Sequence, residues 1–310
     1  MGGKNCRSNS NRMRLRIIIR PHCFMLRNHA VPASRFPSVC TGILLISIFH
    51  GGLQDCLAAG ADQGSEFRGR EIMQRVYKNT IGQNRVSHEV LTLVQPGQRS
   101  RIRNLNLFRK VDENEVRTLI RFTGPASVRR MGILSIEKQD GSADQWIFFP
   151  AASTVRRIPG SRKGDRFAGS DFFYEDILLR MATEETYSWV SGDTLKNESV
   201  DLIESKPSTL QSSAYSRRLL WIATEKNIPL RIDFFKDSDA LPFKRFETLD
   251  TIYQSGQFTI SKAVMHDLET GHSTYLESHS ISHGLELPDN IFTTQALEDG
   301  HFEHAYAPSP

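Results

Sequence analysis

The chain after residue 61 lacks cysteine, because all four cysteines of the 310-residue sequence lie earlier, at Cys6, Cys23, Cys40 and Cys56. This excludes a disulfide framework and a cysteine-based metal or redox site from residue 62 onward. The common catalytic signatures are missing as well: there is no Gly-x-Ser-x-Gly elbow, no Walker loop, no His-Glu-x-x-His pair and no dinucleotide-binding glycine pattern. We therefore expect a protein that is not an enzyme and has no cofactor.

An excess of basic residues is also missing from most of the chain. The formal net charge is +4, but residues 1–61 hold eight Lys and Arg against a single acid, Asp55. Residues 62–310 hold 31 Lys and Arg against 34 Asp and Glu. A slightly acidic body exerts no general attraction on a phosphate backbone, so we expect no nucleic-acid partner.

Long apolar runs are absent too. The run Val39–Phe49 (VCTGILLISIF) has 11 residues, whereas a bilayer-spanning helix needs about 20. This is the length of a signal-peptide core, and small residues follow it at Ala59-Gly60-Ala61. We predict cleavage after Ala61 and secretion, with an uncleaved anchor and a lipid anchor as alternatives. A start at Met25 would give a leader of ordinary length, so residues 1–24 are a candidate mis-set start.

Residues 62–310 are dominated by strand-like alternation. Helical spacing occurs in Glu66–Thr80, in Asp171–Met181, where Ser170 and Asp171 are candidate caps, and in a short Asp289–Leu297 segment, followed by a loose tail, His301–Pro310. The period of two predicts strands at Val86–Val94, Arg99–Phe108, Val116–Phe122, Met131–Glu137, Gln145–Phe149, Thr186–Val190, Ser199–Ser205, Tyr215–Thr224, Pro229–Phe235, Phe243–Tyr253, Phe258–Asp267 and His272–Ile281.

A dozen hairpin-linked strands without an intervening linker predict one domain, residues 62–310, which we expect to be a monomer. A sheet of that many strands must curl or close. We therefore predict a mainly β (α+β) fold, a curved antiparallel half-open barrel whose helices cover an apolar concave cavity.

Two sets of side chains could carry binding chemistry. His279 and His283 share one strand face, but nothing places a third ligand beside them, so we expect no metal site. A basic stripe alternates with apolar residues in the second predicted strand. It could form a basic rim that binds anionic headgroups or a partner protein, or it could simply be the solvent-exposed face of the strand. Its members are Arg99, Arg101, Arg103 and Arg109.

Charges and aromatic residues concentrate in residues 144–177 (DQWIFFPAASTVRRIPGSRKGDRFAGSDFFYEDI). Only one arginine of a neighbouring pair in a strand can face the concave side. We expect that arginine to pair with an acid of the following helix and prefer Arg157. A charge cluster that fixes the fold, a gate to the cavity and carboxylate catalysis remain open. The residues assigned to the cavity and its gate are Trp146, Phe148, Arg156, Arg157, Phe167, Asp171, Phe172, Tyr174, Glu175 and Asp176.

This stretch resembles a known family. The order RFTGP (121–125), Gly132, Leu134, DQWIFFP, VRRI and FAGSDFFYEDI is similar to the periplasmic outer-membrane lipoprotein-sorting proteins, the LolA-like family. Weaker matches continue the resemblance over residues 66–297, namely Tyr215, Trp221, Ile228-Pro229, Lys244 and the turn at residues 270–274.

The resemblance implies a half-open β-barrel covered by helices, with an apolar cavity that shields acyl chains. It implies a carrier or chaperone for a lipid or an acylated protein, serving an inner-membrane exporter of the resistance–nodulation–division type. A protein-binding adaptor of such an exporter, without lipid carriage, is the alternative function.

Overall fold

The computed structural model describes residues 51–179, 185–208, 213–237 and 239–308, all within one compact unit, Phe49–Pro310. The run Val39–Phe49 lies outside the described residues. Helix α1 (Gly51–Ile81) contains the predicted Glu66–Thr80 helix, which is confirmed. The proposed cut after Ala61 falls inside α1 and remains a prediction. No helix in the described part of the chain is long and apolar enough to cross a membrane.

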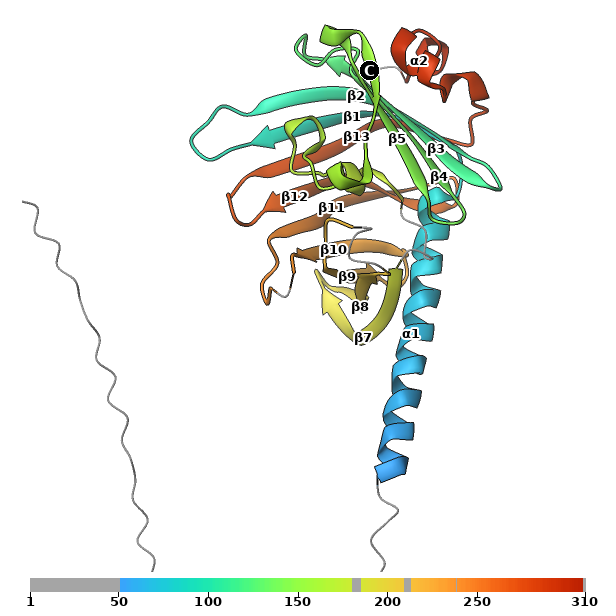
Figure 1. Ribbon diagram of the computed structural model, residues 1–310, viewed down its shortest axis with the longest axis vertical. Coiled ribbons are helices and arrows are strands. Elements are labelled where there is room, and N and C mark those ends of the chain that lie inside the picture. The colour runs from blue at the N-terminus through green and yellow to red at the C-terminus, as the bar shows by residue number, and fades with distance from the viewer. Residues whose placement is uncertain (1–50, 180–184, 209–212, 238, 309–310) are drawn as a thin grey trace, which may run out of the picture. The chain divides into compact units, whose positions relative to one another are not determined.

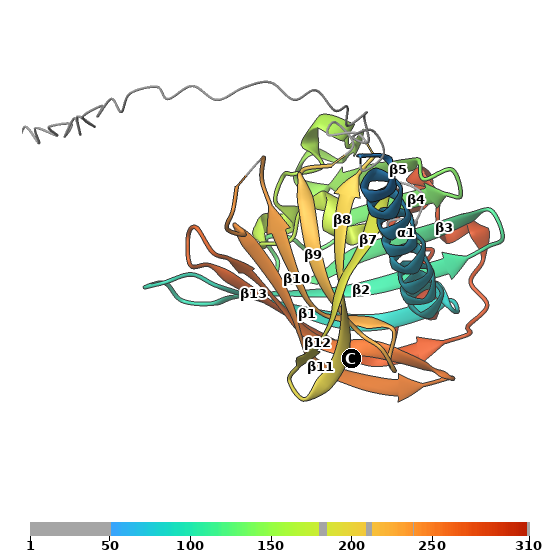
Figure 2. The same ribbon diagram turned by 90° about the horizontal axis from the view of Figure 1, so that it is seen from below.

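The described strands form one 13-stranded antiparallel sheet in the order β6-β5-β4-β3-β2-β1-β13-β12-β11-β10-β9-β8-β7 (Figures 1 and 2). Neighbours in the sheet are neighbours in the sequence, except that β1 pairs with β13. The two edges, β6 and β7, do not meet, so the predicted curved, half-open fold is confirmed. The strands are β1 (Arg85–Val94), β2 (Arg101–Val111), β3 (Glu115–Gly124), β4 (Gly132–Lys138), β5 (Ala143–Phe149), β6 (Thr154–Arg157), β7 (Glu185–Leu195), β8 (Glu198–Pro207), β9 (Arg217–Ala223), β10 (Ile228–Phe235), β11 (Lys244–Gln254), β12 (Gln257–Asp267) and β13 (Ser273–His283).

Both faces of the sheet are covered along β3–β5, which explains why these strands are apolar on both sides. On one face, here called the inner face, Leu105 and Ile120 join a core with Phe167 and Tyr174 from the segment after β6. Phe108 points the other way, into a second core on the outer face. Along β3, Ile120 and Leu119 likewise belong to the inner and outer cores, so alternation buries both sets of side chains there.

The inner face of β1–β5 is covered by residues 158–179, here called the inner loop. It holds three short 3₁₀ turns, η2 (Gly160–Arg162), η3 (Phe167–Gly169) and η4 (Tyr174–Ile177). The predicted helix Asp171–Met181 is therefore wrong over its described part, because only η4 is helical and Leu178 is already extended, with ψ 144°. The Asp176 carboxylate accepts a hydrogen bond from the Phe173 backbone N–H at 2.7 Å. Such local side-chain bonds compete with a continuous helix.

Helix α1 covers the inner face at the other edge of the sheet (Figure 2). Its buried Ile72 and Val76 pack with Tyr187, Leu220 and other residues of β7–β9. Gly69 permits the close approach, because a Cβ there would lie 2.7 Å from the backbone oxygen of Tyr187. The amphipathic pattern of residues 66–80 thus forms one wall of the inner face.

The outer face of β3–β6 is covered by the C-terminal segment with η6 (Asp289–Ile291), α2 (Thr294–Asp299) and η7 (His304–Tyr306). The predicted terminal helix is divided, because Thr293 caps α2 by accepting the Ala296 N–H at 3.0 Å. The predicted loose tail is wrong in its described part. Glu303 is 1% exposed and pairs with buried Arg121 at 2.6 Å.

Candidate ligand-binding cavity

Two adjoining cavities lie between the inner face and its covers. The first, about 190 Å³, lies between the inner loop and β1, β2, β3, β11, β12 and β13. The second, about 290 Å³, lies between α1, the inner loop, β7 and β9–β12. Small-molecule sites measure roughly 300–1,000 Å³, so the two cavities reach that range only in combination.

Phe172 separates the two cavities. Its side chain lines both of them, as do Phe246 and Ile260 from the sheet and Asp176 from the inner loop. The wall elsewhere is largely apolar, with Leu91, Leu105, Leu107, Ile120 and Leu276 in the first cavity and Met73, Val76, Leu220, Ile222, Ile232 and Phe234 in the second. The boundary between the two cavities is therefore formed by the four side chains that line both of them.

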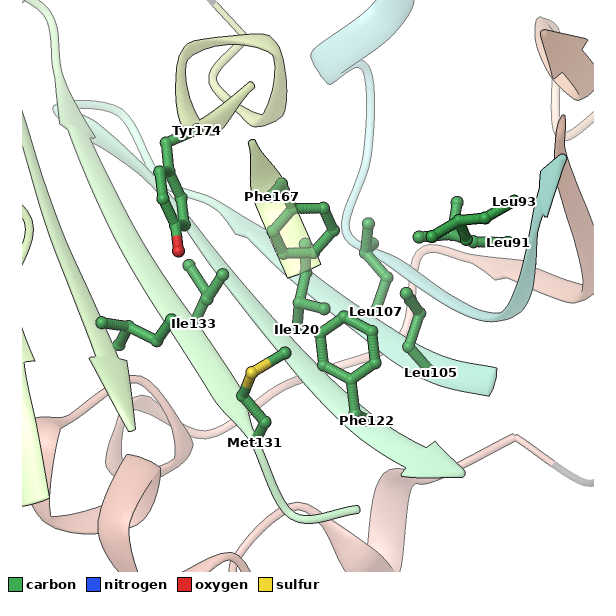
Figure 3. Close-up of a cluster of buried hydrophobic side chains, with 11 residues drawn as sticks. Leu91, Leu93, Leu105, Leu107, Ile120, Phe122, Met131, Ile133, Phe167 and Tyr174 are labelled. Atoms are coloured by element: carbon green, nitrogen blue, oxygen red, sulfur yellow. The ribbon is translucent and has the colours of Figure 1, made fainter. Parts of the chain in front are cut away.

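Phe167 and Tyr174 fasten the inner loop to β3–β5. Figure 3 shows the two rings above Ile120, Phe122 and Ile133 of the sheet. The Phe167 and Phe122 rings lie 5.5 Å apart, and Phe167 and Tyr174 meet edge to face at 6.3 Å. Burial raises the pKa of the Tyr174 hydroxyl, with Arg162 opposing the shift. Phe167 also lines the first cavity, whereas Tyr174 lines a small hollow beside β6.

Asp171 is bound to the sheet, but not through the predicted partner. It pairs with Arg166, and its carboxylate accepts a hydrogen bond from Thr274 Oγ1 at 2.8 Å. Arg157 instead pairs with Asp144, and Arg156 is exposed beside it in β6. The predicted pairing of an inward arginine with the helix acids is therefore wrong. Strand β6 is at the sheet edge, so both arginines reach solvent.

Glu175 and Asp176 bind the inner loop to the segment before β9 and to the first residue of β11. The Glu175 carboxylate accepts hydrogen bonds from Ser213 Oγ at 2.5 Å and from the Ala214 N–H at 2.6 Å. Asp176 pairs with Lys244 Nζ at 2.5 Å and accepts a bond from the Tyr215 hydroxyl at 2.7 Å. The acids that the sequence singled out thus hold the cover of the cavities.

Lys244 is the most deeply buried cation of this arrangement, at 2% exposure. Its Nζ lies 3.6 Å from the centre of the Phe173 ring and donates to the Tyr215 hydroxyl at 2.7 Å. Burial lowers the pKa of Lys244, and the charge of Asp176 opposes that shift. In the sequence, Lys244 and Tyr215 stand out only as part of the family resemblance. The position of this lysine between Phe243 and Phe246 was the one sequence feature that could have indicated a buried ion pair.

Trp146 and Phe148 do not line the cavities. Phe148 is buried on the outer face with Leu287 and Ile291, and Trp146 packs against that cluster. Their neighbours Gln145 and Ile147 face inward instead. The run WIFF is apolar on both faces because both are covered, so the sequence did not indicate which residues point inward.

The two histidines that share a predicted strand face, His279 and His283, have different neighbours. His88 and His279 lie 6.4 Å apart between ring centres, while His283 contacts Gln257 and Thr259. Within the described ranges, no three His, Cys, Asp or Glu side chains are placed to hold a metal ion.

The matching family profile covers residues 114–299, more than half of the chain, and is described only as an uncharacterized-protein-like family. The chain belongs to the DUF1329 family. A solved DUF1329 protein from Desulfovibrio piger is 24% identical, with a TM-score of 0.71, and the match covers 75% of this chain and 99% of that one. No curated protein matches the sequence.

Two further solved structures are similar to this DUF1329 chain and show that it has the LolA-like fold. One, from Vibrio parahaemolyticus, is described as an outer membrane lipoprotein-sorting protein domain, with 23% identity, a TM-score of 0.70 and coverage of 75% and 99%. The other is a LolA superfamily protein from Nitrosomonas europaea, with 19% identity, a TM-score of 0.60 and coverage of 74% and 98%. The chain therefore has the LolA-like fold, as the sequence predicted.

Proposed function

We propose that this protein is a periplasmic carrier that holds an acyl chain, from a lipid or an acylated protein, in the paired cavities. The observation that carries the proposal is the apolar space of about 190 and 290 Å³ under a cover fastened by side-chain contacts. Each CH₂ removed from water contributes about 0.8 kcal/mol, and the inner face supplies the apolar surface that this requires.

The inner loop acts as the cover that a ligand displaces. Phe172 fills the boundary between the cavities, and Asp176 spans from the loop to Lys244 of β11. An entering chain turns Phe172 aside and joins the two spaces. The Asp176–Lys244 pair takes the role that the sequence suggested for one inward arginine, Arg156 or Arg157, with Asp171 or Glu175.

Location and partner belong to the same proposal. The leader with its cut after Ala61 directs the chain to the periplasm, and an inner-membrane exporter of the resistance–nodulation–division type is the partner that the family resemblance suggests. Asp171, Glu175 and Asp176 are engaged with Arg166, Ser213 and Lys244, respectively, which favours a structural role for them over carboxylate catalysis.

Native mass spectrometry of the exported protein tests carriage. We expect a species heavier than the processed chain whose extra mass disappears after organic extraction and is recovered as an acyl lipid. Repeated preparations with only the bare mass, and without uptake of an added apolar probe, would favour the adaptor function instead.

A further inference from the structure

Arg109 of β2 is a buried cation that faces the first cavity. The residue is 7% exposed and lines the wall together with Leu105 and Leu107. Its Nε donates to Thr118 Oγ1 at a long 3.3 Å. Among the described residues, its two terminal nitrogens have no ion pair or hydrogen bond, and neither is sealed away from the cavity. Buried guanidinium groups ordinarily have all their donors paired.

The other charges in this wall have partners. Arg85 Nη2 pairs with Glu89 at 2.9 Å, and Lys244 pairs with Asp176 at 2.5 Å. Glu137 and Glu89 are both close enough to attract Arg109, but neither forms an ion pair with it: Glu137 Oε2 accepts the Leu179 N–H at 2.7 Å, and Glu89 pairs with Arg85. Burial, with repulsion from Arg85, lowers the pKa of Arg109 to about 10. Arg109 is therefore cationic at neutral pH without a counter-ion at pairing distance.

Along β2 the wall changes from the cationic Arg109 to the apolar Leu107 and Leu105, while β1 contributes the polar residues beside them. Arg109 lies opposite Arg85 in the pairing of β1 with β2, Leu107 opposite Ser87, and Leu105 opposite Glu89. Leu91 continues the wall beyond them. Six residues of strand cover about 20 Å, so a cationic end and an apolar stretch share one elongated wall.

We propose that the cavity binds an anionic amphiphile, whose carboxylate or phosphate pairs with Arg109 while its acyl chain lies along Leu107, Leu105 and Leu91. The inference rests on the proposed carrier function and narrows its ligand class. A guanidinium offers a carboxylate or phosphate two parallel hydrogen bonds. A headgroup without charge would leave the same donors unpaired in a buried site.

The test compares oleate, oleoyl lysophosphatidate and monooleoylglycerol, which share one acyl chain and differ in headgroup. Wild-type protein should bind the two anions at least tenfold more tightly than the neutral lipid. Arg109→Met should abolish that preference, while Arg109→Lys should keep part of it. Arg101→Met, at an exposed position of the same strand, is the matched control and should change nothing.

The outcomes separate this inference from carriage itself. Equal affinities of all three lipids for wild-type protein would overturn the role of Arg109 and leave the carrier function standing, even if Arg109→Met fails to fold. Binding of none of them would overturn both. Displacement of oleate by inorganic phosphate alone would overturn the requirement for an acyl chain. A preference for only one anion identifies whether the headgroup is a carboxylate or a phosphate.

Discussion

Replacing Lys244 with methionine should destabilise the protein by about 3–5 kcal/mol, because it leaves the Asp176 carboxylate without its cation in a buried position. The substitution also removes the contact of Lys244 Nζ with the Phe173 ring, 3.6 Å away, and its hydrogen bond to the Tyr215 hydroxyl. For a domain of this size the loss corresponds to a fall in Tm of about 10 °C. Thermal unfolding followed by circular dichroism measures it.

The double variant Lys244→Met/Asp176→Asn is the informative control. Asparagine keeps an oxygen for the Phe173 N–H but removes the unpaired charge, so much of the lost stability should return. Lys236→Met, at an exposed pair with Glu269, should have little effect. A Lys244→Met variant as stable as the wild type would mean that the pair does not hold the inner loop.

Replacing Glu303 with alanine should cost roughly 3 kcal/mol, since it removes the counter-charge of Arg121 in the outer core. Arg121 is 5% exposed, and burial lowers its pKa while the charge of Glu303 opposes that shift. The guanidinium would keep its hydrogen bonds to the backbone oxygens of Leu297 and Ala296, at 2.8 and 3.0 Å. It would, however, be a buried positive charge without the carboxylate that pairs with it.

Urea denaturation measures this effect as a lower midpoint with an unchanged slope. His304→Ala alters an exposed residue of the same tail and should stay within about 0.5 kcal/mol of wild type. If Glu303→Ala unfolds at the wild-type midpoint, the pair with Arg121 does not anchor the C-terminal tail. The tail would then be loose, as the sequence predicted.

The sheet was predictable because its signals are local. Alternation and turn residues such as Asp140-Gly141 place strand ends within a few residues of those observed in β4 and β5. The helix expected at Asp171–Met181 failed because its acids bind partners distant in the sequence, such as Thr274 and Lys244. Helical spacing carries no information about such contacts.

The cavity was predictable in kind but not in detail. The basic stripe of β2 lies on one strand face, yet Arg101 is exposed and Arg109 is buried, because the covers reach only one end of that face. Trp146 and Ile147 are equally apolar, and only the covers decide which of them faces inward. The sequence predicted a covered apolar cavity; tertiary packing selected its residues.

Binding of an acyl-chain fluorophore tests the central claim, that the inner face holds an acyl chain, most directly. Ala263 is 1% exposed and lines the first cavity, whereas its neighbour Lys262 is exposed on the opposite face. We predict saturable binding to wild-type protein and to Lys262→Phe, and at least tenfold weaker binding to a folded Ala263→Phe variant, whose ring occupies the cavity. Equal binding by all three proteins, or none by wild type, would contradict the account.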